Sequence, residues 1–360
     1  MRVIISAGGT GGHIYPALAI VNKIKEMEPN STFLYIGTHN RMEKDIVPKY
    51  DIPFKSIEIY GFNRKNLFKN FKVINCLLKS SKKVKDIIKE FKPDVVIGVG
   101  GYVTYPVIKE AHKLGIKTVI HEQNSVAGKA NLSLSKYVDL ICVSFKSSMD
   151  EFPKNKVVFT GNPCSEDAIK KTPISKSEYG LSKDKKLVLC VMGSLGSSKI
   201  NEYLSNTMKL FNNKDYEIMY VTGKGYYDEV KDIKFPSNVK VVPFIENMTR
   251  LMKSTDLIVT RAGASTLSEI IALKIPSILI PSPYVVNNHQ YKNAMDLTNS
   301  NAAILLEEKD LKGDILVRKV DELLSNKELI KDIKTNLSKF DVKDSATVIY
   351  KNIKKLVMEK

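Results

Sequence analysis

Short hydrophobic runs alternate with amphipathic segments along the whole chain. The first run covers residues 3–7, and behind it Ala17, Leu18, Val21 and Ile24 follow helical spacing. Further runs occupy residues 33–37, 54–59, 94–99, 117–120, 138–143, 157–160, 187–192, 217–222, 239–245, 256–260 and 278–281. Strands that alternate with helices in this way predict an α/β fold with parallel, doubly wound sheets.

The pattern divides the chain into two similar halves. Residues 164–186 are polar, contain Pro173 and lack a hydrophobic run, which predicts a connection between a domain of residues 1–163 and one of residues 164–341. The second half begins as the first does, with a strand, a glycine turn and a helix. We therefore expect two Rossmann-like domains whose glycine turns face an inter-domain cleft. Residues 315–358 are expected to be helical and carry no motif.

The first hydrophobic run ends in the turn Gly8-Gly9-Thr10-Gly11-Gly12-His13. Glycines let the backbone turn sharply and approach a ligand, and the start of the next helix presents N–H groups to an anion. The spacing matches neither a dinucleotide-binding motif nor a P-loop, so a tight turn without a ligand stays open. His13 could act as an acid, a base or a donor, or be structural. Pro16 is expected in the first helical turn.

Polar residues also follow later strands of the first half. The turn Gly100-Gly101-Tyr102 follows one strand, and His121-Glu122-Gln123-Asn124 follows the next. Ligands of open α/β sheets bind outside the carboxyl ends of the strands. These positions are therefore candidate site residues.

In the second half, the densest polar stretch is residues 261–269, directly behind a strand. Gly263 suits a turn into a helix whose N-terminal amides can hold a diphosphate. Glu269 could accept two hydrogen bonds from a ribose diol, although helix capping by Ser265 and Glu269 is an alternative. The loop residues 287–290 and Asn293 carry amides suited to reading sugar hydroxyls.

Composition limits the classes of protein. A chain of 360 residues with 43% hydrophobic residues is globular and long enough for two domains. No apolar stretch approaches ~20 residues, so no transmembrane span is expected, and the first residues predict a strand rather than a signal peptide. The cysteines at 76, 142, 164 and 190 form no Cys-x-x-Cys pair, which argues against a zinc site or a disulfide framework.

The net charge of +17 predicts attraction to a polyanion, either nucleic acid or an anionic membrane. Much of it lies in residues 60–92, from Tyr60 to Lys92, where lysines alternate with aromatic and aliphatic residues. Such a segment can lie on an anionic lipid surface, or it can be a surface helix that packs on the sheet. No recognisable nucleic-acid-binding module is present, so nucleic acid is not an expected partner.

The ordered set of these motifs resembles the MurG family of N-acetylglucosaminyltransferases over nearly the whole chain. The motifs are residues 8–13, 100–102, 121–124, 161–163 (Gly-Asn-Pro), 193–196 and 261–269, followed by His289-Gln290 and Asn293. The resemblance implies a GT-B fold in which a C-terminal helix of about residues 342–360 packs back on the first domain. It implies inverting transfer of N-acetylglucosamine from UDP-N-acetylglucosamine to lipid I, giving lipid II, at the cytoplasmic face of the bacterial membrane.

The resemblance also assigns roles to residues of this chain. Residues 164–341 would bind the donor: Ile245 the uracil, Glu269 the ribose, and Ser194 the diphosphate. The full donor set is Thr10, Gly11, Gly12, Asn124, Ser194, Ile245, Arg261, Gly263, Ala264, Ser265, Thr266, Glu269, His289 and Gln290. The acceptor pyrophosphate would lie on Gly12, Gly100 and Gly101.

An inverting transfer needs a base for the acceptor's C4 hydroxyl and stabilisation of the leaving UDP. His13 is the first candidate base and Glu122 the second. Helix-terminal amides and Arg261 would offset the charge on UDP, so neither a metal nor a cofactor is expected. Ser165 replaces an arginine that contacts the donor in some members, and Leu195 and His289 stand where glutamine is common in members of the family.

Related activities stay open at this stage. A lipid glycosyltransferase with another acceptor would share the fold and the membrane-binding segment, and a sugar-nucleotide 2-epimerase would share the fold alone. The family resemblance places the chain at the membrane as a peripheral protein, with other cell-wall synthesis enzymes as possible partners.

Overall fold

The structure, a computed structural model, describes residues 1–61, 69–192, 198–340 and 343–359, without the side chains of 69–72 and 198–199. The chain forms two compact units. The first combines Met1–Glu166 with Val342–Lys360, and the second is Asp167–Asp341.

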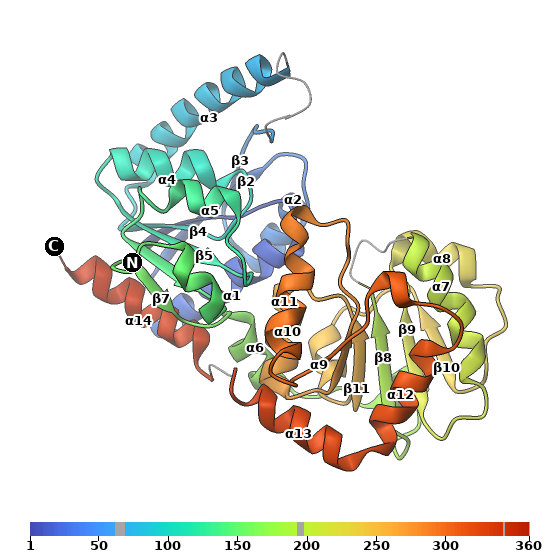
Figure 1. The fold of residues 1–360 in the computed structure, drawn as a ribbon. Helices are drawn as coiled ribbons and strands as arrows, with labels where there is room; N and C mark the ends of the chain where they lie inside the picture. Colours follow the sequence, from blue (N-terminus) through green and yellow to red (C-terminus); the bar gives the residue numbers. More distant parts are fainter. Residues whose placement is uncertain (62–68, 193–197, 341–342, 360) are drawn as a thin grey trace. The chain divides into compact units, whose positions relative to one another are not determined.

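The first unit contains a parallel sheet of seven strands in the order β3-β2-β1-β4-β5-β6-β7 (Figure 1). The strands are β1 (Arg2–Ser6), β2 (Thr32–Thr38), β3 (Phe54–Ile57), β4 (Val95–Gly98), β5 (Lys117–Glu122), β6 (Leu140–Val143) and β7 (Val157–Phe159). The chain switches direction between β1 and β4, so the turns behind these two neighbouring strands meet at one edge of the sheet.

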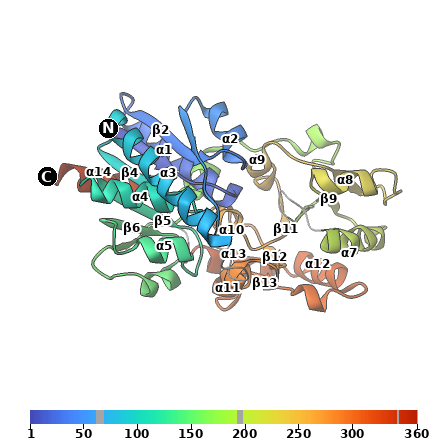
Figure 2. The ribbon, with the colours of Figure 1, turned by 90° about the horizontal axis from the view of Figure 1, so that it is seen from above.

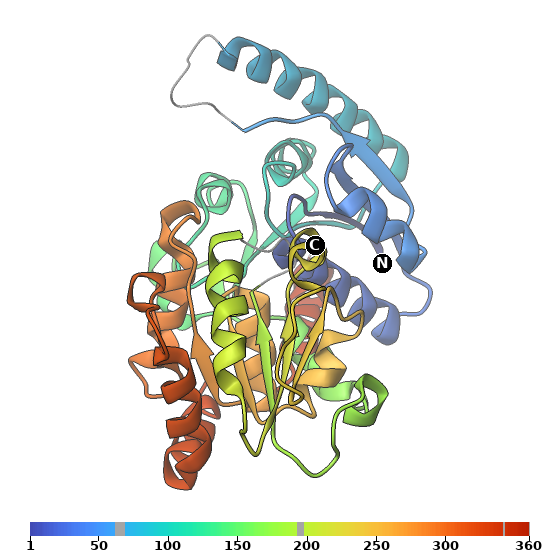
Figure 3. The same ribbon diagram turned by 90° about the vertical axis from the view of Figure 1, so that its right-hand side faces the viewer.

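Helices cover both faces of this sheet because successive side chains of a strand point to opposite faces. Val3 and Ile5 belong to one buried cluster and Ile4 to the other. The helices of the unit are α1 (Gly11–Met27), α2 (Glu43–Ile46), α3 (Lys69–Phe91), α4 (Thr104–Lys113), α5 (Lys129–Leu134), α6 (Cys164–Lys170), which ends in the second unit, and α14 (Ser345–Met358). α3 lies beside α4 (Figure 2), and its first turns extend beyond the sheet (Figure 3).

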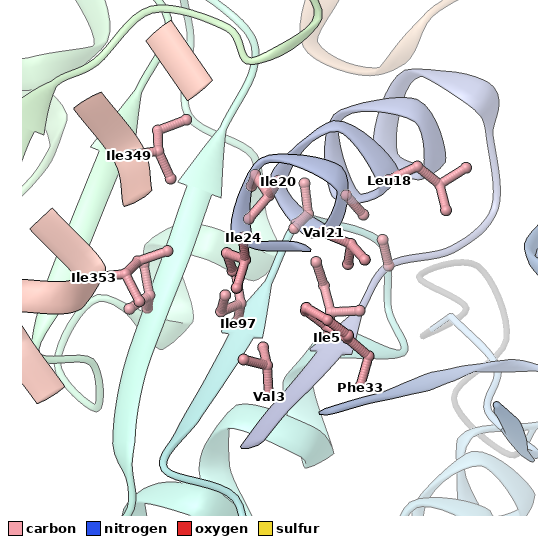
Figure 4. Packing of buried hydrophobic residues seen from close by; sticks show 14 of the residues in the cluster. Val3, Ile5, Leu18, Ile20, Val21, Ile24, Phe33, Ile97, Ile349 and Ile353 are labelled. Carbon is pink, nitrogen blue, oxygen red and sulfur yellow. The ribbon is translucent and has the colours of Figure 1, made fainter. Parts of the chain in front are cut away.

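The C-terminal helix α14 belongs to the core of the first unit, although it is distant in sequence. Ile349 and Ile353 are fully buried against α1, where they join Ile20 and Ile24 (Figure 4). Burial of each such side chain contributes about 1.5–3 kcal/mol. This packing explains why α14 belongs to the first unit, although it follows the second unit in the sequence.

The second unit repeats the arrangement with six parallel strands in the order β10-β9-β8-β11-β12-β13. The strands are β8 (Leu187–Val191), β9 (Glu217–Val221), β10 (Val239–Val242), β11 (Leu257–Thr260), β12 (Ser277–Leu279) and β13 (Ile304–Leu305). The helices are α7 (Ser198–Met208), α8 (Lys224–Val230), α9 (Met248–Met252), α10 (Ala264–Leu273), α11 (His289–Thr298), α12 (Ile315–Ser325) and α13 (Lys327–Leu337). The predicted pair of Rossmann-like, doubly wound sheets is confirmed.

Short 3-10 helices complete the connections. They are η1 (Val47–Tyr50), η2 (Lys146–Glu151), η3 (Lys176–Tyr179), η4 (Lys209–Phe211), η5 (Val286–Asn288) and η6 (Glu308–Asp310).

One local expectation was wrong. Pro16 lies inside α1 rather than in its first turn, because Gly11 and Gly12 already have helical geometry. The expected connection of residues 164–186 contains α6 and η3, and the boundary between the two units falls within it. Residues 315–358 are mainly helical, as expected, and contain α12, α13 and α14. Asn326 separates α12 from α13 and caps α13 through its side chain.

Candidate active site

The glycine turn behind β1 packs directly on the glycine turn behind β4. The Gly8 amide donates to the Gly100 carbonyl over 3.2 Å. A Cβ on Gly101, whose φ is +89°, would lie 2.5 Å from the Gly8 oxygen. Since real side chains do not tolerate that distance, only glycine permits this approach. The two turns form one surface of backbone at the carboxyl edge of the sheet.

His13 lies in the first turn of α1 and completes this surface. Its Nδ1 is 3.0 Å from the Gly8 carbonyl oxygen, which can only accept a hydrogen bond. The neutral ring therefore carries its proton on Nδ1 and its lone pair on Nε2. A Cβ on Gly100 would lie 2.5 Å from the ring, so the imidazole packs closely against this glycine. This fixes the ring in an orientation suited to a base.

Glu43, which the sequence motifs did not indicate, supports the glycine turn from behind. Its carboxylate is fully buried. One oxygen accepts from the Thr38 amide (2.9 Å) and hydroxyl (2.6 Å), and the other from the Gly9 amide (3.1 Å). Glu43 thus couples the end of β2 to the turn behind β1. Its position in an otherwise polar segment offered no signal, apart from its place shortly after a strand.

Glu122, at the end of β5, organises the loop that follows it. One carboxylate oxygen accepts from the amide and side chain of Asn124, at 3.0 and 3.1 Å. The other accepts from the Gly128 amide and the Asn131 side chain, at 2.9 and 2.8 Å. Four donors therefore hold a side chain that is 2% exposed.

His121 is buried beside it and connects three strand ends. Its Nε2 donates to the Gly161 carbonyl (3.2 Å), and its Nδ1 accepts from Gln123, which also donates to Val99. Burial lowers the pKa of His121 to about 4, so the ring is neutral at pH 7. The predicted polar group behind β5 is thus largely satisfied by its own neighbours.

In the second unit, the turn behind β11 leads into α10. Gly263 is the N-cap, and Ala264, Ser265 and Thr266 form the first turn, whose amides lack intrahelical acceptors. The Ser265 hydroxyl is buried and has no hydrogen-bond partner in the described part of the chain. Such a group calls for a partner. This turn has the chemistry of an anion site.

Arg261 was expected to offset the charge on UDP, but its side chain is bound within the protein. Its guanidinium donates to the Ile280 carbonyl over 3.0 Å and forms a buried ion pair with Glu308. Its charge is therefore already paired within the protein. The buried Asn293 side chain donates to the Ala262 carbonyl over 3.1 Å. Both residues position the turn behind β11.

Glu269 lies in the second turn of α10. One oxygen accepts from the Thr249 hydroxyl over 2.7 Å, and the other accepts no hydrogen bond from the described residues. Burial raises the pKa of this carboxyl to about 6, against the opposing effects of Thr249 and Lys171. Glu269 therefore keeps acceptor capacity that the fold does not use.

The remaining donor candidates lie at the same edge of the second sheet. Ile245 follows β10 with its side chain buried. Gln290 accepts from the Ser282 amide over 2.8 Å, and His289 Nδ1 lies 2.9 Å from the Val286 carbonyl. Ser194 lies outside the described residues.

Two features are absent from the described residues. They contain no group of three or more histidine, cysteine or acidic side chains placed to hold a metal ion. Among them, no helix has both the length and the apolar character needed to cross a membrane.

Comparison with known proteins gives one consistent result. Residues 3–143 match the glycosyltransferase family 28 N-terminal domain, and residues 187–349 match the family 28 C-terminal domain. A Bacillus cereus protein named UDP-N-acetylglucosamine--N-acetylmuramyl-(pentapeptide) pyrophosphoryl-undecaprenol N-acetylglucosamine transferase 1 is 48% identical, over 99% of this chain and all of that protein. A Bacillus subtilis protein named as the corresponding transferase is 45% identical over 99% of both chains.

Solved structures agree with this. The crystal structure of MurG from Acinetobacter baumannii superposes with a TM-score of 0.77 at 27% identity, over 98% of this chain and 99% of that chain. A UDP-N-acetylglucosamine 2-epimerase structure from Listeria monocytogenes reaches a TM-score of 0.71 at 14% identity, over 100% of this chain and 97% of that one, and shares the fold.

Proposed function

The chain belongs to the family of UDP-N-acetylglucosamine--N-acetylmuramyl-(pentapeptide) pyrophosphoryl-undecaprenol N-acetylglucosamine transferases, and from this premise we propose its reaction. It transfers N-acetylglucosamine from UDP-N-acetylglucosamine to the C4 hydroxyl of the lipid-linked N-acetylmuramoyl-pentapeptide, a step of peptidoglycan synthesis. The observation that carries the proposal is the full-length likeness to the named transferases. The site geometry is consistent with it.

We propose that the second unit binds the donor. The first-turn amides of α10 and the Ser265 hydroxyl would bind the diphosphate, since helix N-termini favour anions. Glu269 would accept hydrogen bonds from the ribose through its unused oxygen. Ile245 would bind the uracil through its backbone, and Gln290 with His289 would read the sugar hydroxyls. Ser194 keeps its assigned role at the diphosphate.

Charge on the leaving UDP would be offset mainly by the α10 amides. Arg261 is the weaker candidate for this role because Glu308 already pairs its charge. We assign it to positioning the turn, so that the amides point at the diphosphate. Preorganised donors of this kind stabilise charge without reorganisation during the reaction.

We assign the base to His13 rather than to Glu122. Since Nδ1 of the neutral His13 ring carries the proton, Nε2 is its basic nitrogen, whereas both oxygens of Glu122 already accept two hydrogen bonds each. Nε2 would take the proton of the acceptor's C4 hydroxyl while that oxygen attacks the anomeric carbon with inversion and UDP leaves. Glu122 would instead hold Asn124 toward the donor sugar.

The acceptor pyrophosphate would bind the joined glycine turns of the first unit. Gly12, Gly100 and Gly101 would offer backbone amides at the carboxyl edge, beside the His13 ring. Thr10 and Gly11 would contact the donor sugar from the same turn.

We propose that α3 brings the protein to the cytoplasmic face of the membrane. One side of the helix is buried through Val84, Ile87 and Ile88, while Ile74 and Leu78 are 45% and 66% exposed. Lys79, Lys82, Lys85 and Lys89 are also exposed. The segment thus combines both expected roles, because one side packs on the sheet and the other offers cations and apolar side chains to anionic lipid.

The lipid proposal is tested by replacing Lys79, Lys82, Lys85 and Lys89 with serine. Each cation near an anionic surface contributes about 1 kcal/mol, so transfer to an acceptor embedded in anionic vesicles should fall at least tenfold. Transfer to a soluble short-chain acceptor should stay unchanged. A control variant replaces Lys209, Lys240 and Lys312 with serine, three exposed lysines of the second unit, and should keep transfer to both acceptors. Equal losses on both acceptors would contradict membrane binding by α3.

The reaction itself is tested with labelled UDP-N-acetylglucosamine and a lipid I analogue, with and without EDTA. We expect a disaccharide product identified by mass spectrometry, UDP release in equal amount, and activity that survives EDTA. Retained UDP-sugar binding without transfer would contradict the acceptor assignment and lead to other lipid acceptors.

A further inference from the structure

A lysine-lined groove lies in the second unit, at the sheet edge opposite the donor residues. The cavity has a volume of about 790 Å³. Asp256 and Pro276 line it, and they directly precede β11 and β12, whereas Arg261 follows β11. The proposed reaction uses none of its lining residues.

The groove combines a cationic rim with an apolar floor. Its lysines are Lys176, Lys183, Lys253, Lys274 and Lys334, against Asp256 as its one acidic residue. Pro173, which is exposed, and Leu273, which is half-buried, supply apolar surface to the floor, and the buried side chains of Ile174, Met252 and Ile275 lie beneath it. The lysines come from the η3 region, the end of α9, the end of α10 and α13 (Figure 1). Four separate segments of the chain therefore bring positive charge to one depression.

The charges of the rim are not neutralised by the described residues. The side-chain ammonium groups of Lys183, Lys274 and Lys334 form no hydrogen bond or ion pair with that part of the chain. Lys176 and Lys253 donate hydrogen bonds to backbone carbonyls. Since carbonyls carry no net charge, the positive charge of both ammonium groups remains. Asp256 uses one oxygen to accept from the Leu187 amide at 2.8 Å. Uncompensated cations of this kind attract an acidic partner.

Lys274 occupies a strained backbone position. It caps the C-terminus of α10 with φ 53° and ψ 44°, in the left-handed region where glycine is the usual residue. Strain of this kind costs about 1 kcal/mol or more. The lysine side chain is thus placed at the groove despite a backbone cost.

We propose that this groove binds an acidic segment of a partner protein that carries an apolar anchor residue. A small anion would need a few donors that converge on one point, whereas these lysines are distributed around an open rim above an apolar floor. A short peptide satisfies both parts: its carboxylates pair with the rim and its anchor covers the floor. The site lies away from the donor residues, so a bound partner leaves the reaction free to proceed.

The test measures fluorescence anisotropy of a labelled twelve-residue peptide of glutamates with leucine at every fourth position. We expect saturable binding that weakens as salt rises. The variant Lys183→Glu, Lys274→Glu, Lys334→Glu should bind at least tenfold more weakly. A milder variant with glutamine at the same three positions should bind several-fold more weakly. An all-glutamate peptide should also bind several-fold more weakly to the unchanged protein, since it lacks the anchor.

The matched control is Lys209→Glu, Lys240→Glu, Lys312→Glu, which changes the net charge equally at exposed positions outside the groove. It should keep peptide binding within twofold, and all variants should keep transferase activity. An equal loss in the groove variant and the control would overturn the proposal, because net charge alone would explain binding. Absence of binding to the unchanged protein, or displacement of the peptide by millimolar inorganic pyrophosphate, would also overturn it.

Discussion

The two units share one strand order but treat the carboxyl edge of the sheet differently. In the first unit, polar side chains at this edge bind one another, as Glu122 does with four donors and Glu43 with three. In the second unit, Glu269 accepts one hydrogen bond and the Ser265 hydroxyl accepts none from the described residues. Glu43 and Glu122 therefore have both carboxylate oxygens occupied within the first unit, whereas Glu269 keeps acceptor capacity for a ligand. Each edge also has a buried side-chain atom without a hydrogen-bond partner among the described residues, Gln123 Oε1 in the first unit and the Ser265 hydroxyl in the second.

Burial shifts the pKa of one titratable group at each edge, and the two shifts have opposite signs. It lowers the pKa of His121 to about 4, and it raises that of Glu269 to about 6. In both cases the neutral form is favoured, as desolvation requires. Both ring nitrogens of His121 have hydrogen-bond partners within the protein. Glu269 is a stronger hydrogen-bond acceptor when its carboxyl group is ionised. Of these two groups, Glu269 is therefore the one whose protonation state changes near pH 6.

The largest expected effect follows from filling the contact between the two glycine turns. Gly101→Ala places a Cβ 2.5 Å from the Gly8 oxygen at φ +89°, so the turns must separate. We expect transfer to fall more than a hundredfold and the midpoint of thermal unfolding to drop. Gly115→Ala is the control, since its φ is +72° but nothing lies within 4 Å of the added Cβ. It should cost only about 1 kcal/mol of unfolding free energy. Equal behaviour of the two variants would contradict a required close approach.

A smaller loss is expected when the support of the turn is weakened. Glu43→Gln replaces one acceptor oxygen by a donor that faces another donor, at a cost of about 1–3 kcal/mol. We expect kcat to fall about tenfold while the donor KM stays nearly constant, because Glu43 acts on the turn that carries His13. Asp45→Asn, exposed on the same helix α2, should leave both unchanged. A larger change in donor KM than in kcat would contradict this positioning role.

The smallest effect concerns the pH dependence of the second unit. UDP affinity, measured by calorimetry, should rise several-fold as pH increases through about 6, because the Glu269 carboxylate forms in that range. Glu269→Gln should bind more weakly and show no such step. Thr249→Val removes a hydrogen bond that lowers the pKa, so the step should move to higher pH. A step that persists in Glu269→Gln would assign it to another group.

Sequence patterns predicted the fold because a strand buried on both faces of a sheet needs only a short continuous apolar run, as in Val3, Ile4 and Ile5. They also located the strand ends that carry the candidate site. They could not reveal that Glu308 pairs with Arg261, since such partners meet only after folding. Glu43 was missed for a related reason, because a carboxylate in a polar segment is expected to be exposed.

The central claim is that His13 takes the proton from the acceptor. It is tested by single-turnover transfer in His13→Ala, with UDP affinity measured in parallel, and with the exposed His112→Ala as control. A positioned base contributes about 10²–10⁴-fold, so the account predicts a loss of that size with UDP affinity unchanged and full activity in the control. Transfer by His13→Ala at the rate of the unchanged protein would contradict the account.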